Sequence, residues 1–171
     1  ARVNSLEYGL DGWVYGACGL FGGEITCLAN NKVVQLGQRD FRIEPDHGIL
    51  ESVGGRTQQG RAKDDWGHWF GCTNSSLALH FPVEDRYLSR NPFARPPATV
   101  VGIVGGPDGG RLFPTSDLVR FKLTGERGVP TTACGLGIYR DDLLGTDYRG
   151  NLFVNFGSLT MDLALFLEAC V

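Results

Sequence analysis

The chain has 171 residues, of which 42% are hydrophobic and 20% are charged, and its formal net charge is −3. This length and composition predict a single globular domain with a buried core. The small negative charge argues against nucleic acid as a partner, and no apolar run reaches the ~20 residues of a membrane span. Twenty-five glycines and 11% aromatic residues favour short strands joined by tight turns, so we predict an all-β fold.

The first fifty residues alternate between strand and turn patterns. Strands are predicted at 4–8 and 13–17, with a turn between them. A second hairpin is predicted from 24–28 and 32–36, joined through Asn30-Asn31. A further strand at 41–44 then enters the turn Pro45-Asp46-His47-Gly48.

A short phrase occurs three times in the chain. Each copy begins with a turn glycine, at Gly12, Gly67 and Gly150, and has an aromatic residue three positions later, at Tyr15, Phe70 and Phe153. Such self-similarity indicates a repeated supersecondary unit. The copies are 55 and 83 residues apart, whereas a four-stranded propeller blade takes about 40 to 50. Because a closed ring needs ~4 to 8 blades, we predict about three four-stranded blades, forming a β-propeller section of a larger propeller.

The longer second spacing contains a connection rich in proline and glycine at 82–114. It follows a predicted strand at 76–81, and a further strand is predicted at 118–123. Long connections within compact domains are often functional. We therefore treat the chain as one domain over 1–171 whose insertion is a candidate face for a partner or substrate.

The densest group of polar and aromatic residues surrounds the second copy of the phrase. His80 is a candidate general base, because an imidazole beside a carboxylate can accept a hydroxyl proton. The candidate substrate- or cofactor-binding residues are Arg61, Asp64, Asp65, Asn74 and Arg140. The alternative is that Asp65 and Trp66 serve the turn and the packing between blades, and that Arg140 forms surface ion pairs.

The histidines and cysteines do not follow a metal-binding pattern. His68 and His80 lack the spacing of a ligand set, so no metal site is predicted. The five cysteines form no C-x-x-C pair. A bridge between Cys18 and Cys72 is one possibility, and small buried thiols are the favoured interpretation.

Several motifs together resemble the bacterial family of membrane-bound dehydrogenase domain proteins, and they cover most of residues 3 to 154. After Asn155 the sequence leaves the family pattern. The motifs are Asn4-Ser-Leu, Gly9-x-Asp-Gly-Trp-x-Tyr-Gly, Gly60-Arg, Asp64-Asp-Trp-Gly with Trp69-Phe-Gly, Asn74, His80, Arg86-Tyr-Leu-x-Arg-Asn-Pro, Ala133-Cys-Gly, Tyr139-Arg and Tyr148-Arg-Gly-Asn-x-Phe-Val.

The resemblance implies a β-propeller related to soluble quinoprotein glucose and sorbosone dehydrogenases. It implies an exported, periplasmic protein that oxidises a sugar or polyol with pyrroloquinoline quinone and calcium as cofactors. Electrons would pass to a quinone or to a c-type haem domain outside this chain. The chain has no C-x-x-C-H motif, so it is not expected to bind haem covalently itself.

Two functional hypotheses remain open beside a purely structural role for the repeat. The favoured one is a dehydrogenase segment in which His80 is the base and Arg61 holds the substrate or cofactor. The alternative is a non-catalytic propeller that binds a glycan or a protein through its long connection.

Overall fold

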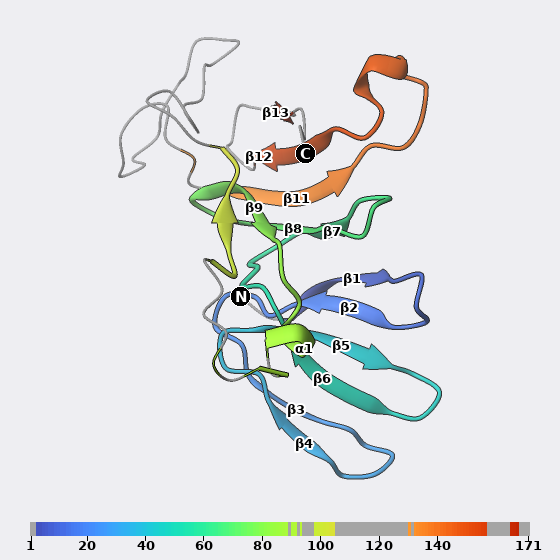
Figure 1. Cartoon of the computed structure of the whole chain (residues 1–171), viewed down its shortest axis with the longest axis vertical. Coiled ribbons are helices and arrows are strands. Elements are labelled where there is room, and N and C mark those ends of the chain that lie inside the picture. Colours follow the sequence, from blue (N-terminus) through green and yellow to red (C-terminus); the bar gives the residue numbers. More distant parts are fainter. Residues whose placement is uncertain are drawn as a thin grey trace.

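The computed structural model describes residues 3–88, 90, 91, 93, 98–104, 130, 132–156 and 165–167. In this part of the chain the structure is all-β, with small antiparallel sheets that resemble propeller blades (Figure 1). The helical elements described are the single turn α1 (Asp85–Leu88) and the 3₁₀ turn η1 (Thr146–Tyr148). The predicted fold class is therefore confirmed.

The first sheet has four strands in the order β1 (Asn4–Tyr8), β2 (Val14–Ala17), β5 (Asp40–Glu44) and β6 (Ile49–Val53). Between β2 and β5 the chain forms the separate hairpin β3 (Glu24–Thr26) and β4 (Val33–Gln35). The predicted strands before residue 45 are confirmed. The inserted hairpin also explains why the first two copies of the phrase are further apart than one blade requires.

The second sheet has the order β7 (Arg61–Lys63), β8 (Trp69–Thr73), β9 (Ser76–Phe81) and β10 (Val101–Gly102). The third consists of β11 (Ala133–Ile138), β12 (Leu152–Phe156) and β13 (Leu165–Leu167). The strand predicted at 118–123 lies outside the described residues.

All three copies of the phrase form the same part of a sheet, the turn between its first and second strands. Gly12, Gly67 and Gly150 have φ angles of 81°, 96° and 85°, in the left-handed region that favours glycine. The third turn is lengthened to include η1, yet its ends stay joined, because the Tyr139 N–H donates to the Asn151 carbonyl oxygen and the Gly150 N–H donates to the Tyr139 carbonyl oxygen. Local turn geometry therefore explains the repeated glycine.

The layers follow one another along the long axis of the molecule, from the β3–β4 hairpin through the first and second sheets to the third (Figure 1). Three apolar clusters separate them. The hairpin packs on the first sheet around Phe41, the first two sheets meet around Trp69, and the second and third meet around Phe70. Because successive strand residues point to opposite faces, the adjacent Trp69 and Phe70 belong to different layers.

Candidate functional site

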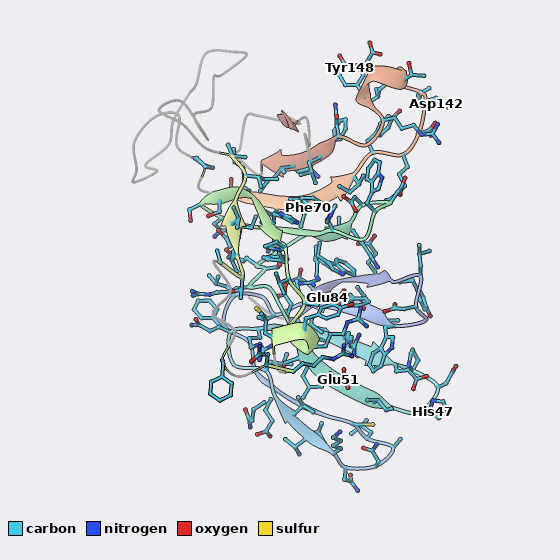
Figure 2. The ribbon with its side chains drawn as sticks, in the orientation of Figure 1. His47, Glu51, Phe70, Glu84, Asp142 and Tyr148 are labelled. Carbon is cyan, nitrogen blue, oxygen red and sulfur yellow. The ribbon has the colours of Figure 1, made fainter. Side chains whose placement is uncertain are left out.

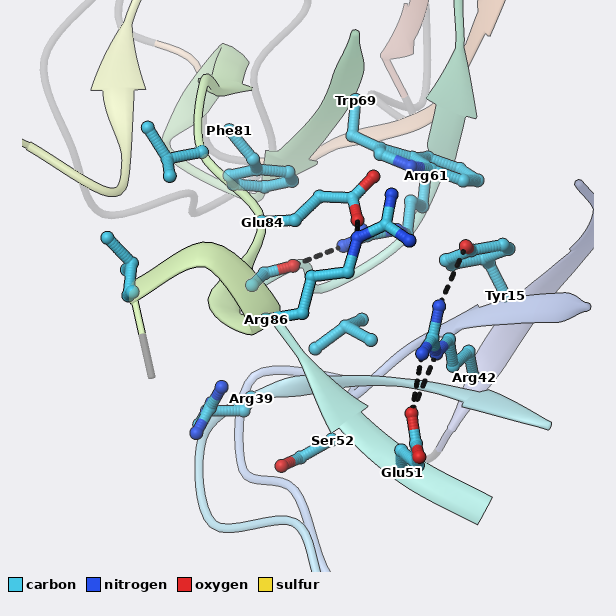
Figure 3. Close-up of a pocket in the computed structure, with 14 residues that line it drawn as sticks. Tyr15, Arg39, Arg42, Glu51, Ser52, Arg61, Trp69, Phe81, Glu84 and Arg86 are labelled. Carbon is cyan, nitrogen blue, oxygen red and sulfur yellow. Dashed lines mark hydrogen bonds and ion pairs between the residues drawn. The ribbon is translucent and has the colours of Figure 1, made fainter. Parts of the chain in front are cut away.

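A cleft of about 760 Å³ lies between the first and second sheets, and the residues just before and within α1 form part of its wall (Figure 3). This volume is in the range of small-molecule sites. Tyr15, Trp69 and Phe81 supply its aromatic surface, and the charged side chains that line it are four arginines and two glutamates. The cleft is therefore the candidate functional site.

Arg61 begins β7 and is one of the residues that line the cleft. Its side chain is 3% exposed and pairs with the fully buried Asp40, and its Nη1 also donates to the carbonyl oxygen of Gly54 at 2.9 Å. The guanidinium carbon lies 4.5 Å from the centre of the Trp69 ring. Burial lowers the pKa of Arg61 and Asp40 opposes this, so the guanidinium stays charged. The sequence-predicted Arg61 is thus part of the cleft.

The Arg61–Asp40 pair is accommodated because residue 55 is glycine. A Cβ atom on Gly55 would lie 2.4 Å from Asp40 Oδ2 and 2.5 Å from Arg61 Nη1. Asp40 also accepts hydrogen bonds from the backbone N–H groups of Cys18 and Thr57, both at 3.0 Å, and from the Thr57 hydroxyl at 2.7 Å. The Asp40 carboxylate beneath the cleft is therefore held in place, and both of its oxygens accept hydrogen bonds.

Arg42 on β5 forms the opposite side of the cleft. It donates to Glu51 through Nε and Nη2 at 3.0 and 2.6 Å, and its guanidinium lies over the Trp13 ring at 4.1 Å. Its Nη1 also reaches the Tyr15 hydroxyl at 3.5 Å. Burial alone would lower the pKa of Arg42, but the bonds to Tyr15 and Glu51 raise it. Arg42 is consequently a rigid cation held by Tyr15 and Glu51 of the first sheet and by Trp13, which directly precedes β2.

The Tyr15 hydroxyl donates to Asp11 Oδ2 at 2.7 Å. Burial raises the pKa of Tyr15, which keeps the hydroxyl protonated and able to donate. Tyr15 belongs to the repeated phrase, and Asp11 directly precedes the glycine that begins it. The first copy of the phrase therefore orients a cleft residue as well as forming a turn.

Glu84, just before α1, and Arg86, within α1, are paired at 2.6 Å between Arg86 Nε and Glu84 Oε2. Figure 3 shows both side chains extending across the cleft toward Arg61 and Trp69. Figure 2 shows Glu84 beside α1 and Glu51 on β6 of the first sheet. The long connection after β9 thus supplies a charged pair to the same cleft.

His80 lies on the other side of the second sheet. It pairs with Phe70 across β8 and β9, whereas Arg61 pairs with Gly71, so the two side chains point to opposite faces. The His80 ring stacks on Phe70 at 5.1 Å and meets His68 edge-on at 5.5 Å. Burial lowers the pKa of His80, with a further contribution from His68. The structure therefore does not bring His80 and Arg61 together.

Asp64 closes the turn between β7 and β8. Its Oδ1 accepts the backbone N–H groups of Trp66 and His68 at 3.0 and 2.7 Å, and its Oδ2 pairs with His68 Nδ1 at 2.8 Å. Around the second copy of the phrase, the carboxylate partner therefore belongs to His68 and not to His80, and the sequence analysis weighed His68 only as a metal ligand. Asp64 has the turn-capping role that an aspartate often has in this position.

The remaining predicted residues lie outside the cleft. Asp65 and Arg140 form an exposed ion pair at 2.7 Å, and Arg140 also donates to the Lys63 carbonyl oxygen. Asn74 is exposed in the turn between β8 and β9, where its N–H donates to Gln58 Oε1 at 2.9 Å. Asp65 and Arg140 link the second and third sheets at their surface.

The structure also bears on metal binding, membrane-spanning helices and disulfide bonds. Within the described ranges, no three His, Cys, Asp or Glu side chains are placed to hold a metal ion, and no helix is long and apolar enough to cross a membrane. Cys18 and Cys72 are free and buried rather than bridged. Burial raises the pKa of each of these two thiols to about 11.

Sequence reasoning did not identify Arg42, Glu51, Glu84 or Arg86 as site residues. Glu51 and Arg42 lie on neighbouring strands, and their proximity depends on the register of β5 and β6, in which they are direct partners. Arg86 belongs to a quoted motif, and Glu84 to the long connection that was predicted as a candidate face. Only the tertiary structure shows that residues 83–88, at the start of this connection, reach the cleft between the first two sheets.

Comparison with known proteins identifies the family but no activity. No curated protein and no solved structure matches this chain. A family model described as a domain of unknown function, DUF7133, matches residues 1–159. The match spans both sheets that form the cleft and the first two strands of the third sheet. The chain therefore belongs to the DUF7133 family.

Proposed function

We propose that this chain binds a sugar or polyol in the cleft between its first two sheets, as the substrate-binding segment of a dehydrogenase. The observation that carries the binding proposal is the combination, in one cleft, of aromatic faces with paired charged side chains. The dehydrogenase activity rests on the resemblance to membrane-bound dehydrogenase domain proteins.

Paired charges suit a ligand rich in hydroxyl groups. A hydroxyl group both donates and accepts hydrogen bonds, so it can use a guanidinium and a carboxylate that lie side by side. The cleft offers two such pairs, Arg42 with Glu51 and Arg86 with Glu84. Their charges cancel within each pair, while their exposed oxygen and nitrogen atoms remain available to hydroxyl groups.

The aromatic residues provide the complementary apolar surface. Tyr15 and Trp69 pack with ring centres 4.3 Å apart, and Phe81 belongs to the same cluster. The C–H groups of a sugar ring or polyol chain would contact this surface while the hydroxyl groups bond to the charged pairs. Small-molecule sites commonly have this composition, an apolar lining with a few polar groups that fix orientation.

Oxidation of an alcohol removes a hydride from carbon and a proton from oxygen, and both need an acceptor. The cleft carboxylates Glu51 and Glu84 are candidate proton acceptors, whereas His80 faces the third sheet. The resemblance implies a quinone as hydride acceptor and a haem domain downstream. The described residues contain no cluster that fits calcium, so we assign no residue to that ion.

The alternative is a binding segment without catalysis, located in the exported compartment that the resemblance implies. Glu84 and Arg86 belong to the long connection and line the cleft. They therefore support ligand binding equally well in the dehydrogenase and in the non-catalytic segment. Both proposals thus share one site and differ only in turnover.

The binding proposal is tested by isothermal titration calorimetry of the purified chain against a panel of monosaccharides and polyols. Glu51→Gln should weaken binding about tenfold, because it removes a charged hydrogen-bond acceptor that lines the cleft beside Arg42. Asp142→Asn, in the exposed loop before η1, is the matched control and should leave affinity unchanged. Absence of binding by every compound would contradict the proposal.

Catalysis is tested separately by dye reduction with the full-length protein, pyrroloquinoline quinone, calcium and the compounds that bind. Turnover would support the dehydrogenase. Binding without turnover for any compound would favour the non-catalytic alternative.

A further inference from the structure

We infer that the ligand of this cleft carries a carboxylate, as sugar acids do, and that the carboxylate is recognised at Arg61 and Trp69. This inference rests on the proposed function, since it specifies which sugars or polyols the cleft takes. Its first basis is a pair of buried hydrogen-bond donors without acceptors.

The two donors are Arg61 Nε and Trp69 Nε1, and neither has a hydrogen-bond partner in the part of the chain that the structure describes. Both residues line the cleft, and the Arg61 guanidinium lies against the Trp69 ring at 4.5 Å. Buried donors without partners are uncommon, because each costs the free energy of its lost hydration. Two of them on adjacent residues of one cleft indicate a place for an acceptor oxygen.

The charge of the cleft favours an anionic acceptor. Four arginines line it, namely Arg39, Arg42, Arg61 and Arg86, against the two glutamates Glu51 and Glu84. Asp40 lies beneath Arg61 and is itself fully buried. Arginines therefore outnumber carboxylates among the residues that line the cleft, which suits a ligand with a negative group.

The chemistry of the donors favours a carboxylate over a hydroxyl oxygen. Hydrogen bonds from N–H groups to an ionised oxygen are shorter and stronger than those to a neutral one. A carboxylate also has two oxygens in one plane, so a single group can reach both neighbouring donors. The polyol part of the same ligand would then extend toward Arg42 and Glu51.

The side chains of Glu84 and Arg86 control access to these donors. They extend across the cleft toward Arg61 and Trp69, and they are 32% and 52% exposed (Figure 3). Because both reach partly into solvent, they can turn aside without disturbing the core. The ligand carboxylate would then enter where the Glu84 carboxylate approaches the floor of the cleft.

The test compares ligands that differ only in the acid group. D-Glucuronate is measured against D-glucose, and D-gluconate against D-sorbitol, by calorimetry at about 0.15 M salt, where long-range charge effects are largely screened. We expect the acid of at least one pair to bind about tenfold more tightly than its neutral partner. Equal binding within both pairs would overturn the inference and leave the proposed function intact, whereas no binding by all four compounds would overturn both.

A matched pair of variants locates the recognition. Trp69→Phe keeps an aromatic ring but removes the indole N–H group, and Trp66→Phe makes the same change at a side chain that is 79% exposed. We expect Trp69→Phe to reduce the preference for the acid at least threefold, and Trp66→Phe to leave it unchanged. An unchanged preference in a folded Trp69→Phe protein would contradict recognition at this place.

Discussion

At the scale of single residues, Asp40 joins the first sheet to the floor of the cleft. Its carboxylate is fully buried, pairs with Arg61 and accepts three further hydrogen bonds from Cys18 and Thr57. A buried ion pair contributes little relative to a well-packed apolar pair. Removing one partner, however, leaves an uncompensated charge and is strongly destabilising.

We therefore expect Asp40→Ala to lower the free energy of unfolding by about 3 to 5 kcal/mol. Equilibrium denaturation in urea measures this change. Asp142→Ala removes an exposed carboxylate from an ion pair of 3.5 Å and should cost less than about 1 kcal/mol. Similar losses in the two variants would show that Asp40 is not the centre of this interaction.

His80 makes the stability depend on pH in a direction that its pKa fixes. Burial lowers the pKa of His80 in the folded protein, so the unfolded chain binds its proton at higher pH. Between the folded and the ordinary pKa, the unfolded state binds more protons, and the free energy of unfolding falls as the pH is lowered. We expect a smaller fall between pH 7 and pH 5 in His80→Phe than in the wild type, measured by urea denaturation.

The control for this pH effect is His47→Gln, which changes an imidazole that is 77% exposed. His47→Gln should show the same fall in the free energy of unfolding between pH 7 and pH 5 as the wild type. If His80→Phe retained the full decline, the burial of His80 would not be its cause.

At the scale of elements, the repeated turn joins the first two strands of each sheet. Its first glycine, Gly12, has open space around it, whereas Gly60, just before β7, is closely packed. A Cβ on Gly12 would have no heavy atom within 4 Å, so only its φ of 81° opposes substitution. A Cβ on Gly60, whose φ is 88°, would lie 2.1 Å from the backbone nitrogen of Leu136 in β11. The second and third sheets can approach each other only because residue 60 lacks a side chain.

Gly60→Ala should therefore destabilise the protein by about 3 kcal/mol, since it combines backbone strain with a clash against β11. Gly12→Ala should cost about 1 kcal/mol from strain alone. Thermal unfolding followed by circular dichroism compares the two variants. Equal shifts in the unfolding temperature would mean that the second and third sheets can move apart to accommodate a Cβ atom at residue 60, which would contradict the prediction.

At the scale of the whole molecule, the second sheet is the shared layer. It packs on the first sheet through Trp69 and on the third through Phe70, so both interfaces depend on β8. Cys18 lies beside Asp40 near the first interface, and Cys72 lies within the second. The two buried thiols therefore report on the two interfaces separately.

We expect Cys18 and Cys72 to resist alkylation at pH 7.5, because they are buried and each has a pKa of about 11. They should become reactive together in one urea transition, since both interfaces depend on the second sheet. Peptide mass spectrometry after pulse alkylation identifies each site, and the partly exposed Cys27 and Cys134 provide the reference. Two separate transitions would show that the sheets unfold independently.

The sequence by itself determined β1 to β5, β9 and the turns of the repeated phrase, because these depend on neighbouring residues, but it did not predict β6, β7, β8 or β10. A glycine at a left-handed position, an aromatic residue three places later and alternating side chains are all local properties. The sequence also proposed Arg61 as a binding residue, and Arg61 lines the candidate cleft. It could not separate Arg61 from His80, because their opposite orientations depend on which residues of β7, β8 and β9 become partners.

Only the tertiary structure decided where a ligand could bind. The cleft joins β5, β6, β7 and the residues around α1, which are brought together by sheet packing rather than by sequence spacing. Arg42 contacts Glu51 because the register of β5 and β6 makes them direct partners. Glu84 lines the cleft because the chain after β9 passes over it. The repeat fixes the blades locally, whereas the contacts between blades create the charged, aromatic site.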